Sequence, residues 1–303
     1  MLRNVIKSSN LLARYAVRKL KGSYSSPEAD YNNVASTYDK HYQKSLAAGL
    51  NNFISIIEKD IEKLNRSNFK VILELAAGTG ESSRDFCLSS ITDFCSSYYL
   101  VDKSHEMLKI NKNKNIQNFS DRGIKMTTYC EDAIEYMRKL PDNSIDVLLC
   151  AWGVCYINSS DLKKEILRVM RKNGYIALIE NRMDSLKEVE SLFFNILKEN
   201  PRLLDKAVSI KLPKNSESMS KAYLPEHANI ITKVDREEKC IFKNTSDLLT
   251  YLMESGVSAG YIDAISSDKR DVFVDMVRNY IERIGAENLP VIHRYSIVTA
   301  EIY

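Results

Sequence analysis

Short apolar runs alternate with amphipathic helical patterns along the chain from about residue 45 to residue 200. The apolar runs have the length of buried strands, and they lie at 71–75, 98–101, 124–129, 145–151 and 175–180. Helical spacing of apolar residues fills the intervals, at 52–64, from 81, from 104, at 131–140 and at 160–171. Near-continuous apolar strands that alternate with helices predict an α/β fold, with a doubly wound, mostly parallel sheet and helices on both faces.

The alternation loosens after residue 180. A helix near 185–199 ends at Pro201, and the stretch 211–236 is polar, with no clear period. A stretch of this length inside a compact domain indicates a functional loop or lid, so we expect 185–236 to be an inserted substrate segment. Beyond it, the pattern predicts a strand at 240–242, helices at 245–255 and 268–284, and a closing strand at 295–300, which brings the sheet to seven strands.

The positive charge of the chain is concentrated at its beginning. Residues 1–27 hold six of the 43 Lys and Arg residues and no acid, which leaves 37 basic against 40 acidic residues, a net of −3, for the rest. A basic, Ser-containing, acid-free amphipathic segment is typical of a mitochondrial presequence, so we expect residues 1–26 to precede a domain at 27–303. The alternatives are a basic helix that packs on the domain or lies on an anionic surface, and a cytoplasmic location.

Composition excludes several classes of protein. The net charge of +3 is small for 303 residues and predicts no nucleic-acid partner. No uncharged apolar run approaches the ~18 residues that span a bilayer. Six cysteines without a CxxC pair and four scattered histidines give no starting point for a metal site, so we expect no metal.

The most informative stretch is Leu73-Glu74-Leu75-Ala76-Ala77-Gly78-Thr79-Gly80-Glu81, which follows a predicted strand. Glycines at such a strand end let the backbone turn sharply and let a ligand approach closely. Ser83 stands where a dinucleotide fingerprint needs a small third residue, and Glu74 would repel a pyrophosphate. Asp102 ends the next strand, where an acid can accept both hydroxyls of a ribose.

This order of motifs resembles the class I S-adenosylmethionine-dependent methyltransferase superfamily, whose fold is Rossmann-like, over about residues 31–180. The resemblance implies S-adenosylmethionine as cofactor, with Glu74 and the Ala76–Gly80 turn at its methionine moiety and Asp102 at its ribose. It places Met107 beside the adenine, and Asp132 and Ala133 at the adenine amino group and ring. Asp132 at the start of a helix is also a natural N-cap.

The same resemblance gives the acceptor-side candidates. Tyr38 and His41 belong to a segment that folds over the cofactor in this superfamily, although Tyr31 and Tyr38 also fit one apolar helix stripe. Trp152 stands where a substrate wall is expected, with ordinary core packing as the alternative. Apart from the resemblance, the composition of the expected lid makes Tyr223 a candidate pocket contact. The candidate catalytic residues are Tyr156 and Glu180, because they follow the fourth and fifth strands.

The expected activity is methyl transfer to a small-molecule acceptor. The sulfonium is already activated, so the protein aligns the acceptor and removes water, and a base is needed only if the acceptor arrives protonated. Two alternatives remain open at this point. Trp152–Tyr156 with Glu180 and Asn181 loosely resembles the α-N-terminal protein methyltransferases, though Tyr156 replaces their His, and a non-methylating cyclase or assembly factor can share the fold.

Overall fold

The computed structural model describes residues 2–25, 31–32, 35–40, 46–66, 68–208, 211–255 and 258–303. The chain forms two compact units, each assembled from three separate segments. The sheet unit comprises 45–185, 211–238 and 294–303, and the helical unit comprises 1–44, 186–210 and 239–293. These bounds differ from the expectation of one domain with a single insertion, because 186–210 and 211–238 belong to different units.

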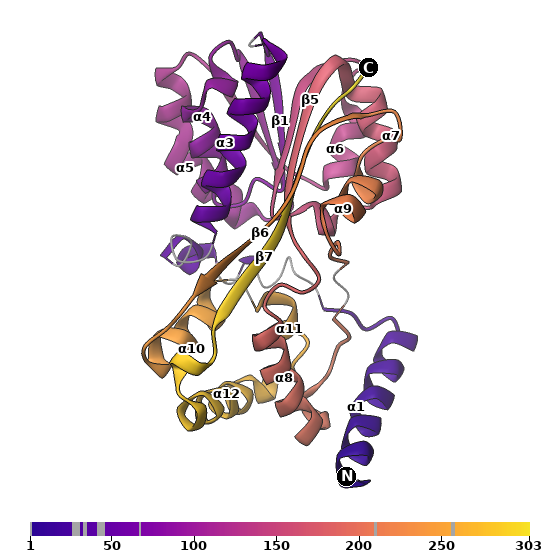
Figure 1. Cartoon of the computed structure of the whole chain (residues 1–303), viewed down its shortest axis with the longest axis vertical. Helices are drawn as coiled ribbons and strands as arrows, with labels where there is room; N and C mark the ends of the chain where they lie inside the picture. The colour runs from indigo at the N-terminus through magenta and orange to yellow at the C-terminus, as the bar shows by residue number, and fades with distance from the viewer. Residues whose placement is uncertain are drawn as a thin grey trace. The chain divides into compact units, whose positions relative to one another are not determined.

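The sheet has seven strands in the order β3-β2-β1-β4-β5-β7-β6 (Figure 1). Their bounds are β1 Val71–Leu75, β2 Ser97–Asp102, β3 Lys125–Cys130, β4 Ile145–Ala151, β5 Met170–Asn181, β6 Asn229–Cys240 and β7 Val291–Glu301. The pairs β1–β2, β2–β3, β1–β4 and β4–β5 are parallel, whereas β5 and β7 are antiparallel. This confirms the predicted doubly wound, mostly parallel sheet.

Helices cover both faces of this sheet (Figure 1). One side carries α3 Ala47–Leu64, α4 Glu81–Leu88 and α5 His105–Asp121, and the other carries α6 Ala133–Lys139, α7 Ser159–Val169 and α9 Ser216–Tyr223. Two short 3-10 turns, η1 Ser90–Thr92 and η2 Val154–Tyr156, follow α4 and β4. The central strands are apolar and buried on both faces, as a helix-covered parallel sheet requires.

One buried carboxylate fastens α3 to the sheet. Asp60 is 1% exposed and accepts hydrogen bonds from Tyr175 (3.1 Å), Thr232 (2.9 Å) and Thr299 (2.5 Å), which lie on β5, β6 and β7. Three hydroxyl donors compensate for the water that this charge loses on burial. The contact therefore fixes the helix over the half of the sheet where the strand direction changes.

One sequence expectation is wrong in detail. The stretch 211–236 is not irregular, because it contains α9, which begins with an Asn215–Ser218 capping box, and most of β6. The Asn/Lys tract 111–118 is helical throughout, because α5 continues to Asp121. Asn173 and Gly174 lie in β5, and α7 ends before them at Val169.

The helical unit has its own apolar core. Its helices are α1 Leu2–Leu20, α8 Lys187–Glu199, α10 Thr245–Glu254, α11 Ala259–Asp263 and α12 Arg270–Ile284, with 3-10 turns η3 Pro201–Leu203, η4 Ser267–Lys269 and η5 Ala286–Asn288. Phe193, Phe273 and Tyr251 are among the largest side chains buried in this core. Residues 31, 32 and 35–40 are also helical.

The basic N-terminal segment is structured and packs within the helical unit. Leu11 is buried with Leu204 and Ala264, and the backbone of Ser23 and Ser25 exchanges hydrogen bonds with Ala207. This packing matches the alternative of a basic helix that lies on the domain. The mitochondrial location and the cytoplasmic alternative both stay predictions. Among the described residues, no helix is long and apolar enough to cross a membrane.

Candidate cofactor-binding site

The loop that follows β1 lies at the point where the order of the sheet reverses. The chain runs outward from β1 through β2 to β3 and then returns to β4 on the other side of β1. The carboxyl ends of β1 and β4 meet there, which is where open α/β sheets bind ligands. The loop turns through left-handed conformations at Ala76 (φ 54°), Gly78 (φ 51°) and Gly80 (φ 87°).

Asp102 joins this loop to the end of β2. One carboxylate oxygen accepts the Gly78 N–H at 2.9 Å and the other accepts the Ser104 N–H at 2.8 Å. Ser104 in turn caps α5, because its hydroxyl accepts the Met107 N–H. The two motifs found in the sequence, Gly78 and Asp102, are therefore in direct contact.

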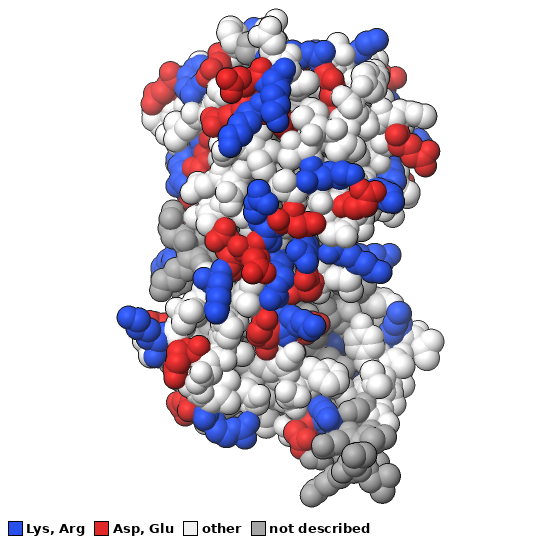
Figure 2. All heavy atoms as spheres, in the orientation of Figure 1, with Lys and Arg blue, Asp and Glu red and all other residues white. Residues whose placement is uncertain are grey.

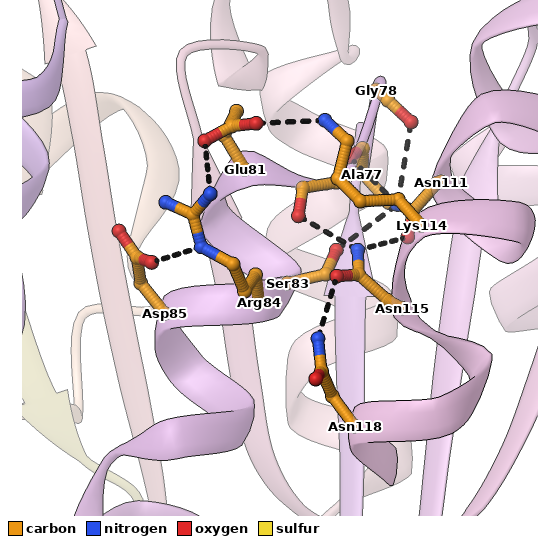
Figure 3. Close-up of polar contacts among 11 residues, drawn as sticks. Ala77, Gly78, Glu81, Ser83, Arg84, Asp85, Asn111, Lys114, Asn115 and Asn118 are labelled. Atoms are coloured by element: carbon orange, nitrogen blue, oxygen red, sulfur yellow. Dashed lines mark hydrogen bonds and ion pairs between the residues drawn. The ribbon is translucent and has the colours of Figure 1, made fainter. Parts of the chain in front are cut away.

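A ladder of asparagines on α5 holds the opposite side of the loop (Figure 3). The Asn111 amide lies within hydrogen-bond distance of the carbonyls of Ala77 (3.1 Å) and Gly78 (3.3 Å), and the Asn115 amide donates to the Gly80 carbonyl at 2.8 Å. Both asparagines are fully buried. Because these amides engage the loop carbonyls, the orientation of the loop is set from α5.

Gly80 and Gly78 differ in their surroundings. A Cβ added to Gly80 would lie 2.3 Å from Asn111 Oδ1 and 2.3 Å from Asn115 Nδ2, whereas a Cβ on Gly78 would meet nothing within 4 Å. Gly80 is therefore required by the close contact with α5. Gly78 is the glycine whose side faces open space.

An alternating chain of charges connects α4 to α5 beside the loop (Figure 3). Glu81, in the first turn of α4, contacts Lys114 at 2.7 Å and Arg84 at 2.8 Å, and Arg84 also contacts Asp85 at 2.8 Å. An acid in the first turn of a helix is favoured by the helix dipole. These ion pairs fix the start of α4, and with it the end of the loop.

Glu74 lies in β1 beneath the loop and is fully buried. Its two oxygens accept hydrogen bonds from Ser82 (2.6 Å) and Tyr98 (2.8 Å). Burial raises the pKa of Glu74 to about 7, in spite of these hydrogen bonds, which act in the opposite direction. Glu74 thus ties α4 and β2 to β1, while its expected contact with a methionine moiety stays a prediction.

The residues expected at the adenine lie at the ends of β2 and β3. Met107 is buried in the first turn of α5. Asp132 caps α6 through the N–H groups of Ile134 and Glu135. Burial acts to raise the pKa of Asp132, but the hydrogen bond from Lys103 and those from the backbone outweigh it and lower that pKa. The cap that was an alternative for Asp132 is therefore present, and Ala133 is the first residue of the capped helix.

Ala76 meets the residues after β4 at very short range. A Cβ added to Gly153 would lie 2.2 Å from the Cβ of Ala76, so only glycine fits there. The preceding residue, Trp152, has a φ of 62° and packs edge-on against Tyr295 at 5.5 Å. Its indole also lies against Gly49 of α3. Trp152 is thus partly buried between β4, β7 and α3, consistent with the packing alternative.

The two catalytic candidates differ sharply in exposure. Glu180 is 1% exposed and accepts the N–H groups of Cys155 (3.0 Å) and Asn181 (2.8 Å), and burial raises its pKa. Tyr156, at the end of η2, is 42% exposed. Glu180 therefore holds the turn that presents Tyr156.

The remaining substrate candidates lie in different parts of the structure. Tyr223 is 5% exposed and packs in the sheet-unit core with Cys150 and Val154, near Glu180 and Cys155, and its expected contact with an acceptor pocket stays a prediction. Tyr38 lies in the helical unit, where its ring meets Tyr31 edge-on at 6.3 Å. His41 lies outside the described residues.

Comparison with known proteins identifies the part of the chain that holds this site. Residues 73–178 match the family model of the methyltransferase domain. The matched segment runs from β1 into β5 and is similar to that family. An uncharacterized methyltransferase-like protein of Schizosaccharomyces pombe is 31% identical over 114 residues, which are 38% of this chain and 39% of that protein. The match therefore spans about two fifths of the length of the curated relative.

Solved structures similar to this chain include a methyltransferase-like protein of Bacillus halodurans and a phosphoethanolamine N-methyltransferase of Haemonchus contortus. The first is 14% identical, covers 82% of this chain and 98% of its own, and has a TM-score of 0.48. The second is 15% identical, covers 91% of this chain and 60% of its own, and has a TM-score of 0.49. Both TM-scores are below 0.5, so neither structure bears on the substrate of this chain.

The asparagine ladder on α5 was not predicted from the sequence. Asn111, Asn115 and Asn118 are spaced by four and three residues, so the helical period already placed them on one face. The same reasoning missed Ser82 and Tyr98, the partners of Glu74. Within the described ranges, no group of three His, Cys, Asp or Glu side chains could hold a metal ion.

Proposed function

We propose that this chain is an S-adenosylmethionine-dependent methyltransferase that acts on a small-molecule acceptor. The observation that carries the proposal is the direct hydrogen bond between Asp102 and the Gly78 N–H, at the edge of the sheet where the strand order reverses. It joins an acid suited to ribose hydroxyls to a glycine turn suited to close approach, inside a segment that matches a methyltransferase domain.

The residues of the methyltransferase domain fit this cofactor. Gly78 has open space on the side where other residues carry a Cβ, which suits the approach of the amino-acid part of the cofactor. A carboxylate has about four acceptor positions, so Asp102 can accept ribose hydroxyls in addition to its backbone bonds. The glutamate beneath the loop and the asparagines behind it keep the turn in place, and Met107 lies in the helix that Asp102 and Ser104 begin.

When bound, the cofactor supplies a methyl group already activated by a sulfonium, so the protein contributes mainly orientation and exclusion of water. The acceptor would approach from the ends of β4 and β5, where Glu180 holds η2 and Tyr156 is exposed. Tyr156 would position the acceptor through its ring and hydroxyl. Glu180 would act on the acceptor through that turn, because its carboxylate is buried among backbone donors.

Surface charge supports a small acceptor over a nucleic acid. On the face shown in Figure 2, basic and acidic side chains are interspersed. Nucleic-acid binding surfaces concentrate Lys and Arg on one face or stripe. Peptide methylation and a non-methylating activity receive no particular support from the site geometry.

Calorimetry with S-adenosylmethionine tests the proposal. We expect Asp102→Ala to weaken binding by about 1–3 kcal/mol, the loss expected for charge-assisted hydrogen bonds. Asp93→Ala removes an acid paired with Arg122 at 2.6 Å and serves as the matched control, with binding unchanged. Formation of S-adenosylhomocysteine in the presence of a metabolite extract then tests turnover. Unchanged affinity in a folded Asp102→Ala variant, or binding of NADH by the unmodified protein, contradicts the proposal.

A further inference from the structure

The face of α1 that packs within the helical unit is mostly polar. Among the α1 side chains that the structure describes, those of residues 9–20, the residues at 11, 14, 15 and 18 are buried or half-buried. They share one helix face, and only Leu11 among them is aliphatic. Arg14 donates to the Leu204 carbonyl at 2.5 Å, Tyr15 donates to the Val208 carbonyl at 2.7 Å, and Arg18 pairs with Asp205 at 2.8 Å. These polar contacts fix the rotation of α1 about its own axis.

The opposite face of α1 is apolar and exposed. Leu12, Val17 and Leu20 are 61%, 46% and 87% exposed, and Ala13 and Ala16 between them are exposed as well. The positions 12, 13, 16, 17 and 20 form one helical stripe, and the same period continues in the sequence through Leu2, Val5 and Ile6. A helix that only stabilises its own domain turns such a stripe inward, so this orientation points to an outside partner.

Charge identifies the kind of partner. Residues 1–25 contain six basic residues and no acidic one. Of the four from residue 9 onward, whose side chains the structure describes, Arg14 and Arg18 make internal contacts. Lys19 and Lys21 are exposed beside the apolar stripe. An apolar stripe flanked by lysines suits the boundary between acyl chains and anionic headgroups, where lysine stems lie along apolar surface and the ammonium groups reach the headgroups.

We propose that α1 is a docking surface for an anionic lipid bilayer, with the stripe Leu12–Leu20 inserted into the headgroup region and the lysines on lipid phosphates. A second copy of the chain fits less well, because pairing two such stripes would bring two acid-free basic segments together. The internal contacts of Arg14, Tyr15 and Arg18 then attach the helical unit to the membrane surface without any spanning segment.

Vesicle co-sedimentation of the full-length protein tests this proposal. We expect binding to vesicles of phosphatidylcholine mixed with phosphatidylglycerol, weaker binding to phosphatidylcholine alone, and loss of the difference at high salt. The double variant Leu12→Glu/Leu20→Glu should lower partitioning on the order of a hundredfold, because it removes the largest apolar contacts with the bilayer. Lys19→Glu/Lys21→Glu should remove the preference for the anionic vesicles.

The matched control is Leu88→Glu/Leu167→Glu, which changes two similarly exposed leucines (60% and 51%) in α4 and α7 and should bind vesicles normally. Thermal melts establish that all variants are folded. Three results overturn the proposal: equal binding by the α1 variant and the control, a lipid-free dimer that only the α1 variant dissociates in sedimentation velocity, or a mature cellular protein that mass spectrometry shows to begin after residue 20.

Discussion

The cofactor and acceptor sides of the candidate site are built differently. On the cofactor side, the loop 76–80 is held by polar side chains from two neighbouring elements, Asp102 on β2 and the asparagines on α5. On the acceptor side, the turn η2 is held by one buried carboxylate, Glu180, and its neighbours Cys150 and Tyr223 belong to the apolar core.

This difference makes the cofactor side the more constrained half of the site. The cofactor loop contains three positive φ values and a glycine with no room for a Cβ, so few residues are compatible with its geometry. Tyr156 is exposed at the end of a short turn and imposes no such restriction. Substitutions on the two sides should therefore differ in their effects on stability and binding.

Gly80→Ala should have the largest effect, because it adds a Cβ both to a left-handed residue and into contact with Asn111 and Asn115. Together these penalties amount to about 4 kcal/mol of unfolding free energy. Gly78→Ala, also at positive φ but with no neighbour within 4 Å, should lose only about 1 kcal/mol. Urea denaturation measures both variants. Equal losses of unfolding free energy would show that contact with the asparagines is not the cause of the Gly80→Ala effect.

Glu74 gives the cofactor side a pH dependence. Its pKa rises from an ordinary 4.5 to about 7 in the folded protein, so folding favours the protonated form. The resulting stability is fully present below pH 4.5 and is lost as pH rises to about 7, a fall of about 3 kcal/mol. The unfolding free energy of the unmodified protein minus that of Glu74→Gln should decrease by this amount over the same pH range. Glu58→Gln, an exposed acid on α3, controls for the loss of a charge, and a constant difference would contradict the prediction.

Asn111→Ala should cost about 2 kcal/mol, because it leaves the buried carbonyls of Ala77 and Gly78 without their side-chain donor. It should also weaken S-adenosylmethionine binding, since the loop loses its support from α5. Asn118→Ala, whose amide makes only a 3.4 Å contact with Asn115, is the matched control and should be close to neutral. Calorimetry and denaturation together check both effects. Full cofactor affinity in a destabilised Asn111→Ala protein would show that the ladder supports the fold alone.

Glu180→Gln addresses the acceptor side and should lower the free energy of unfolding by about 1–2 kcal/mol. The amide keeps one acceptor oxygen for the N–H groups of Cys155 and Asn181, where the carboxylate offers two. We expect the acceptor KM to change while the dissociation constant for the cofactor does not. A weakened cofactor dissociation constant would mean that the two sides are not separable.

The sequence was sufficient for the central strands and for the two central site residues. Apolar runs of four to seven residues located the central strands closely, because a parallel sheet buried on both faces leaves no alternative to continuous apolar sequence. Gly78 and Asp102 were found from their places at strand ends, and the structure places them in contact.

Other features depend on packing that no local pattern encodes. Asn111 and Asn115 belong to a polar tract of the sequence but are buried in the structure. Amides that a neighbouring loop buries look the same in sequence as amides in water. Likewise β6 carries mostly polar and charged residues, since it is the outermost strand and is only partly buried. Its sequence therefore lacked the apolar signal on which the other strands were identified.

The position of β7 has a consequence for synthesis of the chain. β7 lies between β5 and β6 in the sheet, yet its first residue, 291, comes 110 residues after the last residue of β5, 181. At roughly 5–20 residues per second, the ribosome adds that interval in about 5–20 s. During this time β5 presents an apolar strand with unpaired backbone groups, the kind of edge that pairs with other chains. Chaperone capture of the nascent protein should therefore be strongest after β5 has emerged and should end when β7 does.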